Sequence, residues 1–103
     1  MVELDRFKLY ARVDYADDDP LILSMIAAAD NAVRDMTGKL PPGETDELFD
    51  MAVLQLSAHW YENRTPVADG GVHEVPFTIQ VLLSHIALSS RYPEKEDVDG
   101  AAQ

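Results

Sequence analysis

Few residues of this chain could do chemistry, and the first candidates are His59 and Glu62, which lie one helical turn apart. A zinc site needs three or four convergent ligands held by oriented partners. The only other histidines are His73 and His85, and the sequence has no helical His-x-x-x-His pair. Ser57 precedes His59 by two positions and would point to a different helix face. We therefore assign no catalytic residue and no metal ligand, and we expect the protein not to be an enzyme.

Two other patterns resemble ligand sites in part. The Asp17–Asp19 cluster lacks the loop spacing and the terminal glutamate of a calcium loop. Gly70-Gly71 lacks the lysine and the serine or threonine of a phosphate-binding loop. Aspartates before Pro20 are instead typical of a helix start, because Asp19 can cap free amide groups and Pro20 suits the first turn. No cofactor is expected.

The most distinctive run is His59-Trp60-Tyr61-Glu62-Asn63-Arg64. One interpretation is structural: Trp60 and Tyr61 bury ring area, and Arg64 meets the negative end of a helix. A second interpretation makes Glu62 and Arg64 contacts between copies of the chain, since charged partners fix the register of neighbouring subunits. The two interpretations are compatible, and the residue types leave both open.

Composition predicts one small, soluble, acidic domain. The chain has 103 residues and no cysteine, and 19 acidic against 8 basic side chains give a net charge of −11. No segment approaches the roughly 20 apolar residues that cross a bilayer, and the acidic N-terminus is unlike a signal peptide, so no membrane contact is expected. An acidic surface repels phosphate backbones, which argues against groove-reading DNA recognition but suits a surface past which DNA must move.

The elements that position these residues are four helices, so the predicted fold is a compact all-α bundle. Apolar residues from Ile22 to Met36 step by four and three, which is one face of a helix, and Gly38 follows as its terminator. The stretch carrying Trp60 is apolar over most of its circumference, which is typical of a central helix. The predicted helices span roughly residues 2–12, 20–37, 45–64 and 76–88. The long loop at 65–75 could hold a short extended segment at 72–75.

The predicted domain covers residues 1–88, and residues 89–103 are predicted to form a flexible acidic tail. Apolar periodicity assigns eight residues to the core: Phe7, Ile22, Ile26, Val33, Phe49, Leu56, Trp60 and Phe77. The simpler interpretation of the tail is a solvated segment. The alternative is an arm that docks on a partner, with Pro93, Glu94 and Val98 as its candidate contacts.

Three stretches stand out together. The first is residues 4–14, which closes with Arg12-Val13-Asp14, and the second runs from the Asp17–Asp19 cluster through an Ala-rich helix to Thr37-Gly38. The third is the run from His59 to Arg64, followed after the loop by Val75-Pro76-Phe77. In this order and spacing they resemble the bacteriophage head–tail connector, or adaptor, family. Ala11 departs from the larger aliphatic residue that the family often has, and the last helix and tail run longer.

The resemblance implies a subunit that forms a ring below the portal, matches its twelve-fold symmetry, extends the DNA channel and links the capsid to the tail. Its partners would be copies of itself, the portal, the next tail-completion or stopper protein, and passing DNA bound without sequence specificity. Its location would be the head–tail junction of the virion, after assembly in the host cytoplasm. The candidate self-association residues are Arg12, Tyr61, Glu62 and Arg64.

A function of a different class fits the charge equally well: a small acidic regulator that binds and blocks a basic or nucleic-acid-binding partner. Such a regulator would remain a monomer or dimer in sedimentation, whereas a connector would assemble, alone or on the portal. A third hypothesis, a hydrolase that uses His59 and Glu62, predicts that His59→Ala removes activity without unfolding the protein.

Overall fold

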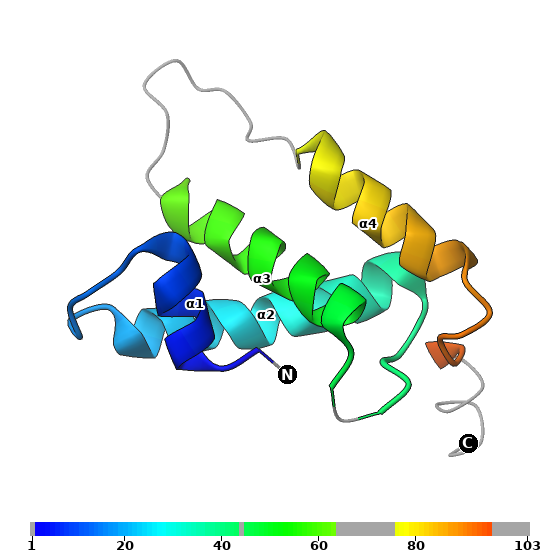
Figure 1. Ribbon diagram of the computed structural model, residues 1–103, viewed down its shortest axis with the longest axis horizontal. Coiled ribbons are helices and arrows are strands. Elements are labelled where there is room, and N and C mark those ends of the chain that lie inside the picture. Colours follow the sequence, from blue (N-terminus) through cyan, green and yellow to red (C-terminus); the bar gives the residue numbers. More distant parts are fainter. Residues whose placement is uncertain (1, 44, 64–75, 96–103) are drawn as a thin grey trace.

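The fold is an all-α bundle, as the apolar periodicity predicts. The computed structural model describes residues 2–43, 45–63 and 76–95, and in these ranges the only β-type pairing is an isolated antiparallel bridge between Lys39 and Glu94. The helices in Figure 1 are α1 (Leu4–Ala11), α2 (Asp19–Thr37), α3 (Glu47–Glu62) and α4 (Phe77–Leu88). The extended segment expected at 72–75 lies outside the described residues, as do Arg64 and Val98.

The ends of the helices follow from local chemistry. α2 ends at Gly38, whose φ of 69° is left-handed and whose N–H donates to the Arg34 carbonyl. Asp46 caps α3 by accepting a hydrogen bond of 3.0 Å from the Phe49 N–H. Asp19 differs from expectation: it caps nothing and lies in the first turn of α2, where its carboxylate accepts from Lys8 Nζ at 2.8 Å. This ion pair ties α2 to α1.

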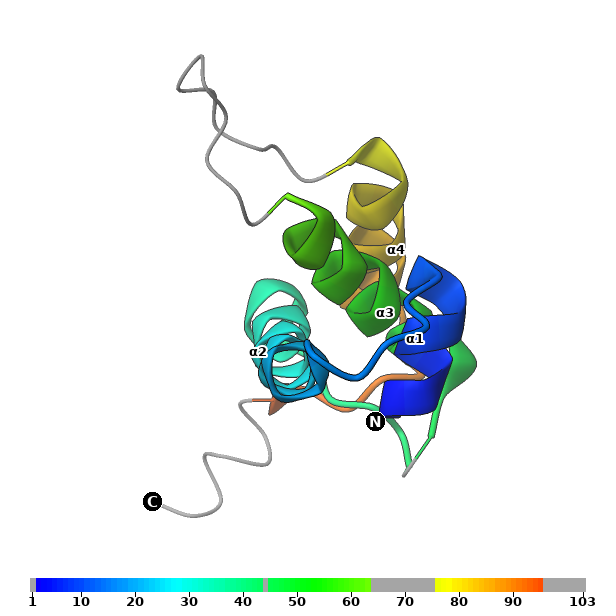
Figure 2. The ribbon, with the colours of Figure 1, turned by 90° about the vertical axis from the view of Figure 1, so that its left-hand side faces the viewer.

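α3 is the central helix, as its broad apolar surface predicts. It packs against α2, α4 and α1, and Figure 2 shows it between α2 on one side and α1 on the other. Along the longest axis of the molecule, α1 lies toward one end and α4 toward the other (Figure 1). None of the helices described is long and apolar enough to span a bilayer.

The core forms where α2 and α3 meet, with α1 and α4 covering its sides. Six of the residues assigned to it are buried: Phe7, Ile22, Ile26, Val33, Phe49 and Leu56. Trp60 is partly buried at the edge of this cluster. The assignment of Phe77 to the core is wrong, because its side chain is 74% exposed. α4 packs on one side only and turns Ile79 and Ile86 inward, which leaves Phe77 on the outer side.

The predicted tail begins too early. Ser89 to Lys95 pack against the domain, and the side chain of Tyr92 is only 1% exposed. The Leu40 N–H donates to the Pro93 carbonyl at 2.9 Å, and the Lys95 N–H donates to the Gly38 carbonyl at 2.8 Å. The charged composition of this stretch predicts a solvated tail, but one large aromatic residue in it, Tyr92, is buried in the core.

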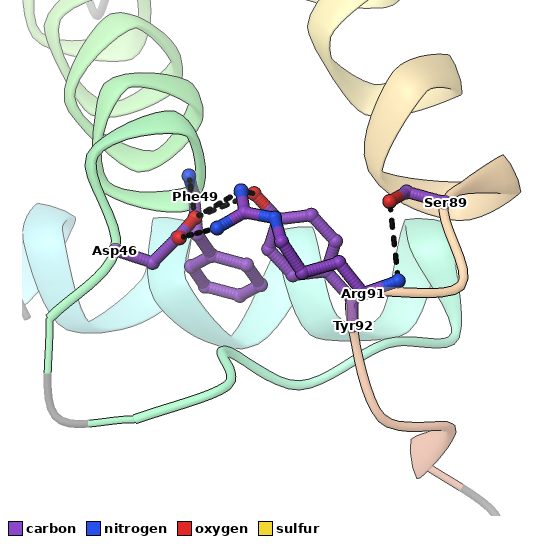
Figure 3. Close-up of polar contacts among 5 residues, drawn as sticks. All are labelled: Asp46, Phe49, Ser89, Arg91 and Tyr92. Carbon is purple, nitrogen blue, oxygen red and sulfur yellow. Dashed lines mark hydrogen bonds and ion pairs between the residues drawn. The ribbon is translucent and has the colours of Figure 1, made fainter.

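Tyr92 is held by Asp46, and Figure 3 shows the contacts. The Tyr92 hydroxyl donates to Asp46 Oδ2 at 2.5 Å, and Arg91 Nη1 lies 2.7 Å from Asp46 Oδ1. Burial alone would raise the pKa of Asp46, but the hydrogen bonds from Tyr92, the Phe49 N–H and Arg91 outweigh it and hold that pKa below its ordinary value. Burial and the bond to Asp46 raise the pKa of Tyr92 to about 12. We call Asp46, Arg91 and Tyr92 the Tyr92 anchor; it fixes the C-terminal end of α4 to the start of α3.

Candidate assembly surface

The outer side of α4 has no Asp, Glu, Lys or Arg and carries three large exposed apolar side chains. Phe77, Val81 and Leu88 are 74%, 50% and 87% exposed. Their spacing of four and seven residues places them on one side of the helix, and we call them the α4 face. The whole of α4 contains no Asp, Glu, Lys or Arg. Two copies of a chain with a net charge of −11 can approach here with the least repulsion, and interface centres are depleted of charge in the same way.

A cleft beside the α4 face is formed by residues of α1, α3 and α4. Its volume is about 160 Å³, and the residues that line it include Tyr10 of α1, Gln55, Ala58, His59 and Glu62 of α3, and Ile79 of α4. Glu62 is exposed and forms no ion pair within the described part of the chain. The cleft is therefore lined mainly by polar groups, among them Gln55, His59 and Thr78, beside the carboxylate of Glu62.

His59 leaves one polar atom of this cleft unsatisfied. Its Nδ1 lies 3.3 Å from the Asn63 side-chain nitrogen, an amide donor, so Nδ1 is the acceptor and the ring proton is assigned to Nε2. Nε2 is buried and has no hydrogen-bond partner among the described residues. A buried N–H without an acceptor is unfavourable. An acceptor that entered the cleft from another molecule would remove this penalty.

Arg12 is the free cation of the described chain. Arg6, Lys8, Arg34, Lys39, Arg91 and Lys95 all form ion pairs. Arg12 forms none among the described residues; it is exposed and ends α1 with a left-handed φ of 59°. Leu9, one turn earlier, is 83% exposed. Both line a shallow hollow on the outer side of α1 that also includes Asp14.

Of the remaining candidate contact residues that the structure describes, one is buried and the others already have partners within the chain. Tyr61 is buried, so it is not a surface contact of this fold: its hydroxyl donates to Asp18 at 2.5 Å and lies 3.0 Å from the Tyr15 hydroxyl. These bonds raise the pKa of Tyr61. Glu94 is exposed, but its carboxylate accepts from the buried Lys39 Nζ at 2.5 Å, so it already has a partner within the chain. Pro93 is exposed, and its carbonyl bonds Leu40.

The α4 face was the part of this surface that the sequence analysis missed. Periodicity placed Phe77 in the core because α4 is apolar on all sides and gives no direction. The available signal was the uninterrupted lack of charge from Pro76 to Ser90 in an acidic chain. As for ligand chemistry, no group of three or more His, Asp or Glu side chains that could hold a metal ion occurs in the described ranges.

An all-helical domain with an uncharged helix face on an acidic surface has the features of a protein that assembles with other proteins. The family model for phage gp6-like head-tail connector proteins matches residues 1–87. The chain therefore belongs to this family, whose members are structural components of the virion rather than enzymes, and the resemblance seen in the sequence is confirmed. Comparison with curated proteins and with solved structures gives no match.

Proposed function

We propose that this connector forms a ring below the portal, extends the DNA channel and offers a platform to the next tail protein. The observation that carries the proposal is the α4 face: three exposed apolar side chains on a helix without Asp, Glu, Lys or Arg, in a chain of net charge −11. Exposed apolar patches of this kind mark protein–protein contacts. The ring would match the twelve-fold portal, and assembly would begin in the host cytoplasm and end at the head–tail junction.

Assembly is the mechanism in this proposal. A protomer that contacts its neighbour through two different surfaces forms a closed ring when the rotation between copies closes. The many carboxylates of the chain then make an acidic lumen, which lets DNA pass because it does not attract phosphates. An image of the ring that resolves the helices tests this point. A lumen lined mainly by Lys and Arg would contradict it.

Negative-stain imaging of the purified protein, alone and mixed with its portal, tests the ring directly. We expect annular particles with a central hole, at least in the mixture. The family membership favours the connector over an acidic regulator, which would remain a monomer or dimer in sedimentation with and without the portal. Absence of any assembly in the presence of the portal would overturn the proposal.

Val81→Asp tests the α4 face with a matched control. Val81 and Leu23 are exposed to nearly the same extent, 50% and 51%, but Leu23 lies on α2. A carboxylate at position 81 adds charge to the only uncharged helix among those described, so we expect at least a tenfold loss of association with little change in the free energy of unfolding. Leu23→Asp adds the same charge outside the α4 face and should lose far less association than Val81→Asp. Equal association of the two variants would exclude the α4 face from the interface.

A further inference from the structure

Within the described residues, one cation has no ion-pair partner, and one cleft holds both a free carboxylate and an N–H without an acceptor. Arg12 is exposed and has no ion-pair partner, whereas every other described lysine and arginine is paired. Glu62, at the edge of the cleft between α1, α3 and α4, has a free carboxylate, and His59 beside it has a buried Nε2–H without an acceptor. Arg12 lines the hollow on α1 and is not among the residues that line the cleft.

We propose that the end of α1 in one copy docks into the cleft of a second copy, with Arg12 paired to the neighbour's Glu62. This inference rests on the proposed ring and names the contact that builds it. The occupant is a second copy because the charges complement each other: on a chain of net charge −11, the one free cation of the described ranges meets a carboxylate that lies beside the uncharged α4. Few other pairings between two such acidic surfaces avoid repulsion.

The chemistry around this pair is also complementary. Leu9, one turn before Arg12, brings an exposed apolar side chain next to the cleft, where the α4 face begins at Phe77. Asp14, two residues after Arg12, is exposed and has no hydrogen-bond partner within the described chain. Its carboxylate is an acceptor that the unsatisfied His59 Nε2–H can use. One short segment thus supplies a cation, an apolar contact and an acceptor.

Arg12 is exposed and has an unusual backbone conformation. Arg12 is the only described non-glycine residue with a positive φ, 59°, at a helix end where glycine is the favourable residue. An arginine there is unfavourable for the fold of the isolated protomer. A contact that needs the guanidinium explains why a charged side chain occupies the position, and it makes the interface heterologous: each copy uses the end of α1 on one neighbour and the cleft on the other.

Charge reversal at both positions tests the pair. Arg12→Glu and Glu62→Arg should each lose at least tenfold in association constant, measured by sedimentation velocity with the full chain, alone and with the portal. The double variant R12E/E62R should recover assembly. An equimolar mixture of the two single variants should also assemble, because every interface between alternating copies again pairs one arginine with one glutamate.

Three controls make the result decisive. Lys95→Glu makes the same charge change as Arg12→Glu at another site and should assemble normally. Arg12→Gly should lose association while the fold becomes no less stable in urea unfolding, which a purely structural role of Arg12 does not allow. If the single variants form rings like the wild type, or if neither the double variant nor the mixture recovers assembly, the Arg12–Glu62 contact is wrong although the ring stands. If the wild type forms no ring with the portal, the proposed function fails as well.

Discussion

At the scale of single residues, two helix ends solve the same backbone problem with different residues. Arg12 and Gly38 both have a left-handed conformation, with φ of 59° and 69°. Glycine adopts it without steric cost, whereas a side chain does not. A Cβ at position 38 would meet nothing within 4 Å, so any penalty there comes from the backbone alone. The comparison isolates conformational strain from packing.

Arg12→Gly should raise the free energy of unfolding by about 0.5–1 kcal/mol, because it relieves this strain and Arg12 makes no ion pair to lose among the described residues. Gly38→Ala should lower it by about 1–2 kcal/mol. Urea unfolding of the two variants under conditions where the protein is monomeric measures both effects. A loss of stability in Arg12→Gly would show that the arginine holds the fold together.

Tyr92→Phe keeps the ring in the core and removes the hydrogen bond to Asp46, so it should cost about 1.5–3 kcal/mol at pH 7. Folding raises the pKa of Tyr92 from about 10 to about 12, so the folded state favours the protonated phenol. This stabilisation is complete below pH 10 and is lost as the pH rises to 12. The difference between wild type and Tyr92→Phe should therefore shrink between about pH 10 and about pH 12 in denaturant unfolding. A constant difference would contradict the link to Asp46.

The same anchor responds to acid through Asp46. Its pKa is lowered on folding, so its stabilisation is present above its ordinary pKa near 4 and is lost as the pH falls below that value. Burial raises the pKa of Asp50, which acts in the opposite direction over the acid range. The pH profile of the whole protein thus combines opposing contributions from two buried carboxylates on adjacent turns of one helix start.

At the scale of elements, α4 and α3 show why an apolar helix is not always central. Both are apolar over most of their surface, but α3 has neighbours on several sides, whereas α4 packs mainly on α2 and α3. α4 therefore buries Ile79 and Ile86 and leaves the α4 face exposed. The exposed side of α4 is therefore the part of this helix that a second protein can cover.

Alanine substitutions on the two sides of α4 should differ sharply. Ile86→Ala opens a cavity at a fully buried site and should lower the free energy of unfolding by about 2–5 kcal/mol. Phe77→Ala removes a larger but mostly exposed side chain and should change it by about 0.5 kcal/mol or less. Thermal or urea unfolding of the monomer checks the pair. A comparable loss in Phe77→Ala would mean that Phe77 is buried after all.

The helices themselves were predictable because each combines apolar periodicity with a start or stop signal. The predicted ranges 20–37 and 76–88 lie within one residue of α2 and α4. Which side of α4 faces the core was not predictable, since a helix that is apolar on all sides has no preferred buried face. The packing of Tyr92 was missed because its partner Asp46 is far away in sequence, and local composition carries no information about such contacts.

The candidate site was predictable to a similar degree. Arg12 and Glu62 were singled out from the sequence, and both are exposed. Tyr61 was assigned to the same set, but its hydroxyl bonds Asp18 and Tyr15 in a partly buried network. The unsatisfied His59 Nε2–H depends on the side-chain position of Asn63 and on burial by neighbouring helices, and a sequence pattern encodes neither.

At the scale of the whole molecule, the net charge opposes the proposed assembly, so local complementarity has to overcome the repulsion. Each copy carries −11, so neighbouring copies repel one another over distances that salt controls. The Debye length falls from about 30 Å at 0.01 M salt to about 8 Å at 0.15 M. Close contacts such as a partly desolvated ion pair are screened much less than the long-range repulsion.

Association of the wild type should therefore strengthen as salt rises from about 0.01 to about 0.15 M. Sedimentation velocity at fixed protein concentration over this range measures the change. Leu23→Asp, which adds a negative charge away from the α4 face, should show a steeper dependence than the wild type. If association weakens steadily as salt rises, attraction between opposite charges rather than relief of repulsion would control assembly.

The Tyr92 anchor makes the packing of α3 and α4 depend on residues that follow α4. A chain that stopped before Arg91 would leave the Asp46 carboxylate without its side-chain partners and would uncover Phe49, which packs beside the Tyr92 ring. α4 would lose its attachment at the C-terminal end. A chain truncated before Arg91 should therefore unfold at a lower urea concentration than the full chain.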